Sequence, residues 1–112
     1  MAGNKIRRGD LVAVALPGAY GKPRPAMVIQ SDVFEVHPSV TILPLTSELR
    51  RTPLFRIAVK PTPENGLRNP SQVMIDKAYT VPRDKVGQRI GALDDDTILA
   101  VNRALAVFLG FD

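Results

Sequence analysis

Short apolar runs separated by turn-forming residues fill about the first ninety residues of the chain. Each run has the length of a strand, and prolines and glycines lie between the runs, a pattern that predicts short β-strands rather than helices. The expected strands, of which the last is the weakest, are residues 11–16, 26–30, 40–45, 55–60, 73–75 and 89–93. Several strands of this length and spacing are typical of a small antiparallel barrel or a strongly bent sheet.

The third run contains a proline, Pro44. Proline has no backbone N–H and therefore removes one hydrogen bond from a sheet. We expect this strand to lie at an edge of the sheet or to be bulged at Pro44.

The final segment has a helical pattern instead. Apolar residues recur in it at spacings of three and four: Ile98, Val101, Leu105 and Phe108. Asp94 is a suitable N-cap, and Gly110 is a suitable stop. Asp95 and Asp96 place negative charge in the first turn, where the helix dipole favours it. The spacing predicts a C-terminal helix that covers the sheet.

Three further apolar residues of this helix lie off the stripe: Leu99, Val107 and Leu109. The helix is therefore apolar on more than one face. Either the second face is a contact between two copies of the chain, or the helix is buried entirely within one subunit. We expect a homodimer and keep the buried helix as the alternative.

The length of the chain fits one domain, residues 1–112, and its composition agrees with a reducing compartment. The chain has no cysteine, which excludes disulfides and a cysteine-based zinc site or nucleophile. No secretory signal follows the basic N-terminus, and no apolar run approaches the roughly 20 residues that span a membrane. We expect a cytoplasmic protein.

Charge and ligand chemistry favour an anionic partner and no metal. Lys and Arg outnumber Asp and Glu by 15 to 11, and a basic balance favours nucleic acid. His37 is the only histidine, without a cysteine or paired carboxylates at ligand spacing, so we expect no metal. The sequence contains no glycine-rich phosphate-binding loop, so we expect no nucleotide cofactor. His37 is either an ordinary loop residue, which we favour, or a catalytic acid or base.

Polar groups at strand ends are the remaining candidates for chemistry. Arg24 lies between Pro23 and Pro25, which favour an extended backbone and prepare its guanidinium to bind a planar anion such as phosphate. Thr46 ends the third run, and if the second and third strands form a hairpin, Arg24 and Thr46 meet. Guanidinium and hydroxyl together make a phosphate clamp. The alternative is a solvated arginine at a strand end.

Several motifs in order resemble the MazF/PemK family of toxins over about residues 6–110. They are Arg8-Gly9-Asp10, Arg24-Pro25-Ala26-Met27-Val28-Ile29, Pro44-Leu45-Thr46-Ser47, Gly66-Leu67 and Ser71-Gln72-Val73 with Asp76. The resemblance implies a mainly β fold with a C-terminal α-helix, a small SH3-like β-barrel of the CcdB/MazF/PemK type. It also implies a dimer that cuts single-stranded RNA without a metal or other cofactor and is held inactive by a cognate antitoxin.

The resemblance further implies that the ribose 2′-hydroxyl attacks the phosphate, leaving a 2′,3′-cyclic phosphate and a 5′-hydroxyl. Arg24 and Thr46 match the catalytic arginine and threonine of the family. Thr46 would position a phosphate oxygen, and Arg24 would stabilise developing charge. The general base and acid stay unassigned, because a guanidinium has a pKa above about 12.

Five other residues are expected to contact RNA: Tyr20, Lys22, Ser47, Gln72 and Asp76. The first two would stack on a base and hold a phosphate. Met74 stands where the PemK-type branch has an arginine two residues before the aspartate, which makes Asp76 doubtful as a catalytic acid; the alternative is a structural hydrogen bond.

Two other functions use similar barrels. CcdB-like toxins bind DNA gyrase through a C-terminal tryptophan, but this chain has no tryptophan. A non-catalytic nucleic-acid-binding barrel is the other alternative. The pairing of Arg24 with Thr46 favours the ribonuclease.

Overall fold

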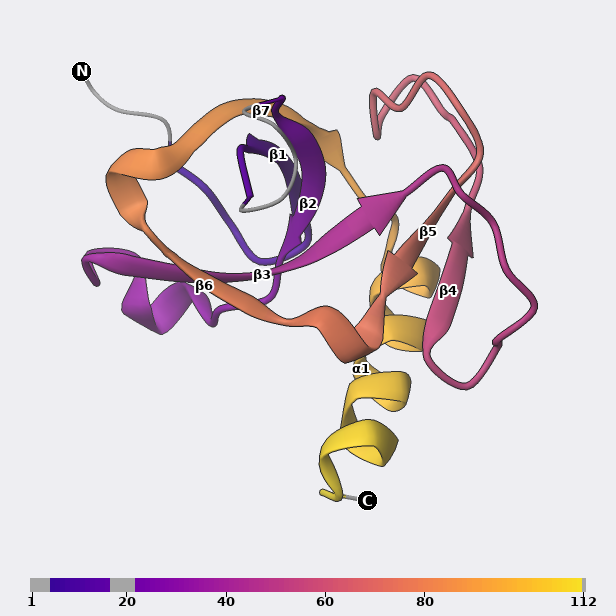
Figure 1. Cartoon of the computed structure of the whole chain (residues 1–112). Helices are drawn as coiled ribbons and strands as arrows, with labels where there is room; N and C mark the ends of the chain where they lie inside the picture. Colours follow the sequence, from indigo (N-terminus) through magenta and orange to yellow (C-terminus); the bar gives the residue numbers. More distant parts are fainter. Residues whose placement is uncertain (1–4, 17–21, 112) are drawn as a thin grey trace.

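A strongly bent antiparallel sheet and a C-terminal helix make up the structure, a computed structural model that describes residues 5–16 and 22–111 (Figure 1). The strands of these residues are β1 (Asp10–Val14), β2 (Arg24–Val28), β3 (Ser39–Thr46), β4 (Arg56–Val59), β5 (Ser71–Met74), β6 (Tyr79–Pro82) and β7 (Val86–Ala92). Helix α1 (Asp95–Leu109) follows, and there are short 3₁₀ helices η1 (Asp32–Phe34), η2 (Ile75–Lys77) and η3 (Arg83–Lys85).

The strand order is β4-β5-β3-β2-β1-β7, with β6 paired to β3 beside this path. Figure 1 shows β6 and β7 curving round β1 and β2. Among the described residues no ladder joins β6 to β7, so the ring of strands is bent but not closed by hydrogen bonds. The predicted mainly β fold with a C-terminal helix is confirmed, with an open bent sheet in place of a closed barrel.

The expectation that Pro44 marks an edge strand or a bulge is wrong. Strand β3 is central: it pairs with β2 on one edge and with β6 and then β5 on the other. Thr41 faces β2, because its carbonyl accepts from Ile29 N at 3.1 Å. The backbone groups of successive residues point to opposite edges of a strand, so the Pro44 nitrogen faces the edge that pairs with β6 and β5. On that edge Pro44 lies between residues 39–42, which pair with β6, and residues 45–46, which pair with β5. The proline occupies the gap where β3 changes partner.

The sequence reading missed β6 altogether. Only Val81 of its four residues is buried, so the strand has no apolar run to identify it. The expected strand at residues 73–75 is shifted: β5 ends at Met74, and Ile75 begins η2. The weakest expectation, residues 89–93, corresponds to most of β7.

Both faces of the bent sheet are buried, because successive residues of a strand point to opposite faces. One cluster lies on the side of α1: Leu11, Met27, Leu43, Leu45, Val59, Val73, Ile75, Leu93 and Val101. The other lies inside the curl: Val12, Val14, Ala26, Val28, Val40, Ile42 and Val81. This two-sided burial explains why β1, β2 and β3 have nearly continuous apolar sequences.

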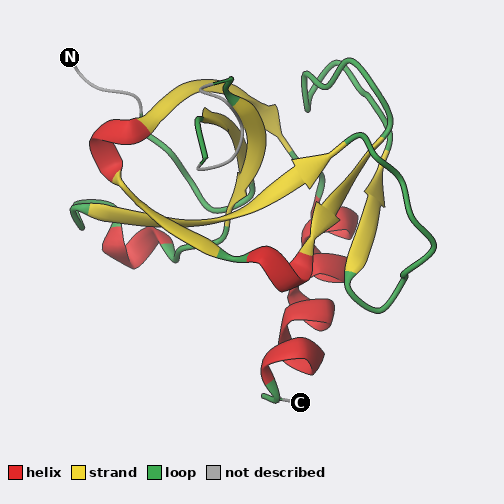
Figure 2. Ribbon diagram, viewed as in Figure 1, coloured by secondary structure: helices red, strands yellow, loops and turns green. Residues whose placement is uncertain are grey.

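Helix α1 has the predicted ends. The Asp94 carboxylate accepts from Thr97 N at 2.7 Å, and Gly110 adopts the left-handed conformation with φ of 82°. The helix packs against β4 and η2 beneath the sheet (Figure 2). Apolar residues of the helix are exposed all the same: Leu99 and Val107, which lie off the core-facing stripe, and Phe108 and Leu109 in the last turn are each about half accessible. The alternative of a helix buried within one subunit is therefore wrong for this chain. No helix in the described parts of the chain has the length and apolar character to cross a membrane.

Candidate functional site

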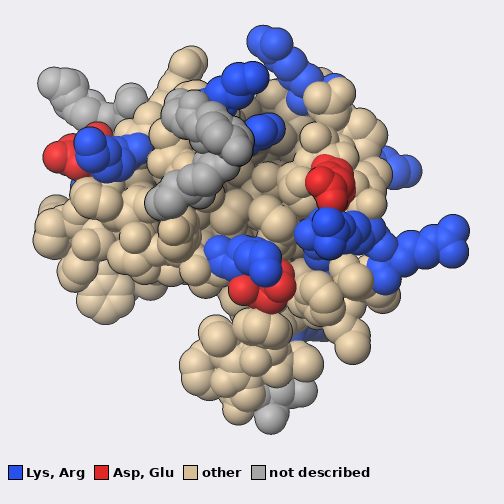
Figure 3. Space-filling model, in the orientation of Figure 1, with Lys and Arg blue, Asp and Glu red and all other residues tan. Residues whose placement is uncertain are grey.

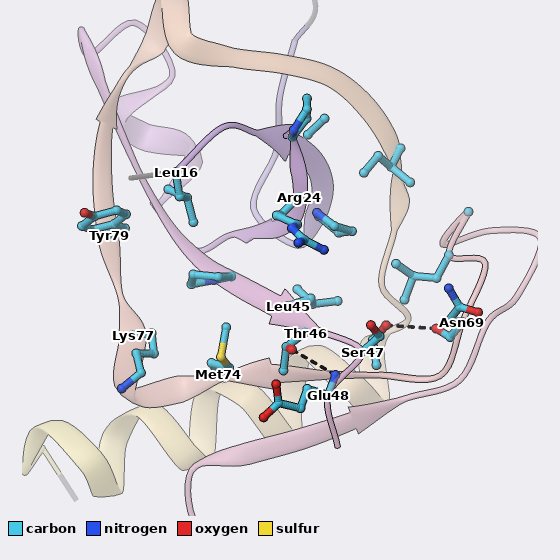
Figure 4. Close-up of a pocket in the computed structure, with 18 of the residues that line it drawn as sticks. Leu16, Arg24, Leu45, Thr46, Ser47, Glu48, Asn69, Met74, Lys77 and Tyr79 are labelled. Carbon is cyan, nitrogen blue, oxygen red and sulfur yellow. Dashed lines mark hydrogen bonds between the residues drawn. The ribbon is translucent and has the colours of Figure 1, made fainter. Parts of the chain in front are cut away.

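An open cavity of about 1300 Å³ lies where the ends of β2 and β3 meet the loops around β5 (Figure 4). Its lining comes from β1 to β3, the loop after β3, the loop between β4 and β5, strand β5, the η2 segment, the start of β6 and β7. The polar and charged lining residues are Arg24, Thr46, Ser47, Glu48, Arg68, Asn69, Ser71, Asp76, Lys77, Tyr79, Gln88 and Arg89.

The structure brings Arg24 and Thr46 together at this cavity. Strands β2 and β3 pair antiparallel from Val28 opposite Ile42 to Ala26 opposite Pro44, and Arg24 and Thr46 each lie two residues beyond this ladder, at the same end of it. Both side chains line the cavity and are seen in it in Figure 4. The Arg24 side chain makes no ion pair with any described residue, so its guanidinium is available to an anion. This is the arrangement that the hairpin argument predicts.

The Thr46 hydroxyl is held by the loop that follows it. Its Oγ1 accepts a hydrogen bond from Glu48 N at 3.0 Å, drawn as a dashed line in Figure 4. A hydroxyl has one hydrogen to donate and two lone pairs to accept with. With one lone pair occupied by the backbone, the hydroxyl hydrogen stays free to donate to a ligand oxygen.

Glu48 is a cavity residue that sequence reasoning missed. Its carboxylate Oε1 accepts from Arg50 Nη2 at 2.6 Å and from Arg50 Nε at 3.2 Å. The hydrogen bond and the positive charge of Arg50 hold the pKa of the exposed Glu48 carboxyl below its ordinary value of 4.5. Glu48 is therefore ionised at neutral pH beside Thr46. The only sequence signal was its position two residues after that threonine.

Arg89 of β7 is a second missed residue. Its guanidinium meets the buried carboxylate of Asp10, with Nε to Oδ2 at 3.3 Å and Nη2 to Oδ1 at 3.3 Å. Asp10 also accepts from Arg7 N at 2.9 Å. The Arg89 side chain is half exposed and faces the cavity. An acidic residue at the start of an apolar strand signals a cationic partner, but the sequence does not say which one.

The loop between β4 and β5 forms one wall of the cavity and is organised by buried Asn65. The Asn65 Oδ1 accepts from Thr62 N and Leu67 N, and its Nδ2 donates to Lys60 O at 2.8 Å. The wall packs backbone to backbone on β7: a Cβ added at Gly91 would lie 2.4 Å from Glu64 O. Glycine at this position allows the close approach that fixes the wall.

Of the other predicted residues, some line the cavity and some do not. Ser47 and Asp76 line the cavity. Asp76 Oδ2 lies 3.2 Å from Lys77 Nζ, whereas its buried Oδ1 has no hydrogen-bond partner among the described residues. Lys22 is exposed and is not one of the described lining residues. Tyr20 lies outside the described residues.

Gln72 and His37 do not line the described cavity. The Gln72 amide is engaged by the loop after β3, where Nε2 donates to Arg50 O at 2.8 Å. The His37 ring accepts from Ser39 N at 3.1 Å and packs edge-on against Phe34. The structure thus places His37 in a local turn, in agreement with the favoured loop reading.

Comparisons with known proteins identify the family of the chain. Residues 7–109 match the family described as PemK-like, MazF-like toxin of type II toxin-antitoxin system. The chain is 47% identical to "Probable endoribonuclease MazF" of Mycolicibacterium smegmatis, over 94% of this chain and 97% of that one.

Solved structures share the fold. Mycobacterium tuberculosis toxin MazF-mt6 superposes with a TM-score of 0.79 at 27% identity, over 92% of this chain and 98% of that one. A mycobacterial endoribonuclease solved in complex with its cognate antitoxin gives 0.79 at 24% identity, over 96% and 97% of the two chains. From the family match and the 47% identical relative, the chain belongs to the PemK-like, MazF-like toxins of type II toxin–antitoxin systems.

Proposed function

We propose that this chain is the toxin of a type II toxin–antitoxin system and an endoribonuclease that cuts single-stranded RNA without a metal. The observation that carries the proposal is that Arg24 and Thr46 line the same open cavity, in a chain 47% identical to a "Probable endoribonuclease MazF". The reaction is attack of a ribose 2′-hydroxyl on the adjacent phosphate, with products that carry a 2′,3′-cyclic phosphate and a 5′-hydroxyl.

In this mechanism Thr46 and Arg24 act on the phosphate oxygens. The Thr46 hydroxyl, whose oxygen already accepts from Glu48 N, donates its hydrogen to one oxygen and positions the phosphate. The Arg24 guanidinium stabilises the negative charge that grows on the oxygens as the pentacovalent state forms. A guanidinium stays protonated, so another group must take the 2′-proton. The described lining offers two carboxylates, Glu48 and Asp76.

The charge of the cavity suits a polyanion. Its described lining holds four basic residues, Arg24, Arg68, Lys77 and Arg89, against the two acidic ones. Figure 3 shows lysine and arginine side chains gathered on this face. Phosphates of a strand running through the cavity would meet net positive charge, which favours binding and makes it depend on salt.

The assembly proposed for this toxin has three parts. The chain is one domain over residues 1–112 and works in the cytoplasm. Two copies associate through apolar residues of α1 that the single chain leaves exposed, among them Leu99, Val107, Phe108 and Leu109. A cognate antitoxin inhibits the dimer, as expected for a member of this family.

The decisive experiment incubates the protein with end-labelled single-stranded RNA in EDTA. Wild type is compared with Arg24→Ala and with Arg51→Ala, a matched control at an exposed arginine outside the described cavity lining. We expect discrete cuts with cyclic-phosphate ends from wild type and from the control, and none from Arg24→Ala. Intact RNA with folded wild-type protein would contradict the proposal, and inhibition of gyrase supercoiling would then support the CcdB-like alternative.

A further inference from the structure

The loop after β3 is fastened to the side chain of Gln72. Gln72 lies on β5 directly opposite Thr46 in the β3–β5 ladder. Its Nε2 donates to Arg50 O at 2.8 Å, and its Oε1 accepts from Arg50 N at 3.0 Å. One side-chain amide thus satisfies both backbone groups of Arg50, as the peptide group of a neighbouring strand would.

Arg56 extends this fastening towards the cavity. Its Nη1 donates to Gln72 Oε1 at 3.2 Å and to Glu48 O at 2.9 Å. The N–H of the same Glu48 donates to Thr46 Oγ1 at 3.0 Å. A continuous series of hydrogen bonds therefore runs from the Gln72 amide through the loop backbone to the Thr46 hydroxyl.

We propose that Gln72 is a positioning residue for Thr46; this inference rests on the proposed ribonuclease function. By fixing the loop at Arg50 and, through Arg56, at Glu48 O, Gln72 keeps the Glu48 N–H on one lone pair of Thr46 Oγ1. The hydroxyl hydrogen is then kept out of the direction of the Glu48 N–H and can donate to the substrate phosphate. Gln72 itself does not touch RNA, in contrast to the role first expected for it.

The amide is the group that this position requires. Arg50 presents a donor and an acceptor at once, and only an amide offers both complementary groups in one plane. A glutamate at position 72 would keep the acceptor for Arg50 N and Arg56 but would leave Arg50 O without its donor. Gln72→Glu therefore tests the donor separately from the acceptor.

The first test compares steady-state cleavage of an RNA oligonucleotide by wild type, Gln72→Ala and Gln72→Glu. We expect kcat to fall about ten- to a hundredfold in Gln72→Ala, since a misplaced group loses rate without losing binding, while KM changes less than about twofold. Gln72→Glu should retain part of kcat. A raised KM with normal kcat would overturn the proposal and indicate direct RNA contact.

The second test asks whether Gln72 acts through Thr46. Thr46→Val removes the hydroxyl, so adding Gln72→Ala to it should cost no further activity, because residues that act as a unit are not additive. If the activity loss of the double variant equals the product of the two single-variant losses, the proposal is overturned. Gln30→Ala is the matched control: Gln30 fastens the β2–β3 loop in the same way, with Nε2 to Ser39 O at 2.8 Å and Oε1 to Thr41 N at 3.1 Å. It is outside the described cavity lining, and its activity should equal that of wild type.

A third readout is independent of catalysis. Arg50 and Arg51 are trypsin sites within the fastened loop, and Gln72→Ala should accelerate cleavage there severalfold at a temperature where both proteins are folded. Wild type that fails to cut RNA would contradict the proposed function, whereas unchanged proteolysis in Gln72→Ala would contradict the fastening itself.

Discussion

Single side chains decide what the cavity does to a phosphate. Arg24 presents a planar fork with two adjacent donors, and Thr46 presents one hydroxyl whose oxygen is already held by the backbone of Glu48. In the proposed mechanism the two residues act differently: Arg24 supplies directed positive charge, and Thr46 supplies a hydrogen-bond donor. A substitution of Arg24 by lysine tests whether the planar guanidinium or only its positive charge is required.

Arg24→Lys is expected to keep RNA affinity within about twofold and to lose at least about tenfold in kcat, because an ammonium keeps the charge but not the bidentate geometry. Filter binding and single-turnover cleavage would separate the two quantities. Arg51→Lys, outside the described lining, serves as the control. Near-normal turnover of Arg24→Lys would contradict the bidentate clamp.

The Asp10–Arg89 pair joins residues 79 positions apart and is expected to contribute to stability. Arg89→Ala leaves the buried Asp10 carboxylate without its cation, which should lower the unfolding free energy by about 1–2 kcal/mol after allowance for the half-exposed arginine. Urea unfolding measures this loss. Adding Asp10→Asn removes the unpaired buried charge and should restore most of the lost unfolding free energy. A double variant that is less stable than Arg89→Ala would show that the loss does not come from the unpaired Asp10 carboxylate.

At the scale of elements, local signals were sufficient for the helix and insufficient for the sheet. Asp94 and Gly110 act on the turn beside them, so the ends of α1 were predictable. Pro44 was misjudged because the exchange of partners along β3 depends on β5 and β6, which lie far along the chain. Strand β6, with one buried residue, carries almost no pattern.

The same distinction applies to the site. Arg24 and Thr46 were predictable because they lie on neighbouring strands of a hairpin-like pair, where register follows from sequence. Arg89 was not, because its partner Asp10 is brought to it only by the β1–β7 ladder. Gln72 was assigned to RNA from its type and place, and only the structure reveals the loop that occupies its amide.

The N-cap of α1 gives the element a dependence on pH. Hydrogen bonds from Thr97 hold the pKa of Asp94 below its ordinary value of 3.8. A carboxyl with a lower pKa in the folded chain stabilises the fold above its ordinary pKa, and this stabilisation is lost as the pH falls through the folded value. Asp94→Asn keeps a capping oxygen but does not titrate.

Wild type should therefore lose more Tm than Asp94→Asn between about pH 5 and pH 2, and the two should have a constant difference in Tm above about pH 5. Calorimetry across this range provides the comparison. Parallel Tm curves down to pH 2 would show that the cap carries no titrating stabilisation.

At the scale of the molecule, the exposed apolar residues of α1 are the feature that a single chain leaves unexplained. Leu109 is 54% exposed, so Leu109→Asp should leave the fold of one chain intact and weaken self-association by at least about tenfold, because a charge would have to be buried in the contact. Sedimentation at several concentrations would report the change. Val36→Asp, at an exposed apolar position in the loop before β3, is the control, and equal dissociation of both variants would exclude this contact.

The cavity is assembled from distant parts of the chain, with lining residues from Ala13 to Ile90. This has a consequence for synthesis, which delivers the chain from its N-terminus at a limited rate. While the ribosome holds a chain that stops short of β7, Arg24 and Thr46 have already emerged but one wall of their cavity is absent. We therefore expect a nascent chain that ends before β7 not to cleave RNA, because it lacks Gln88, Arg89 and Ile90 of the cavity lining.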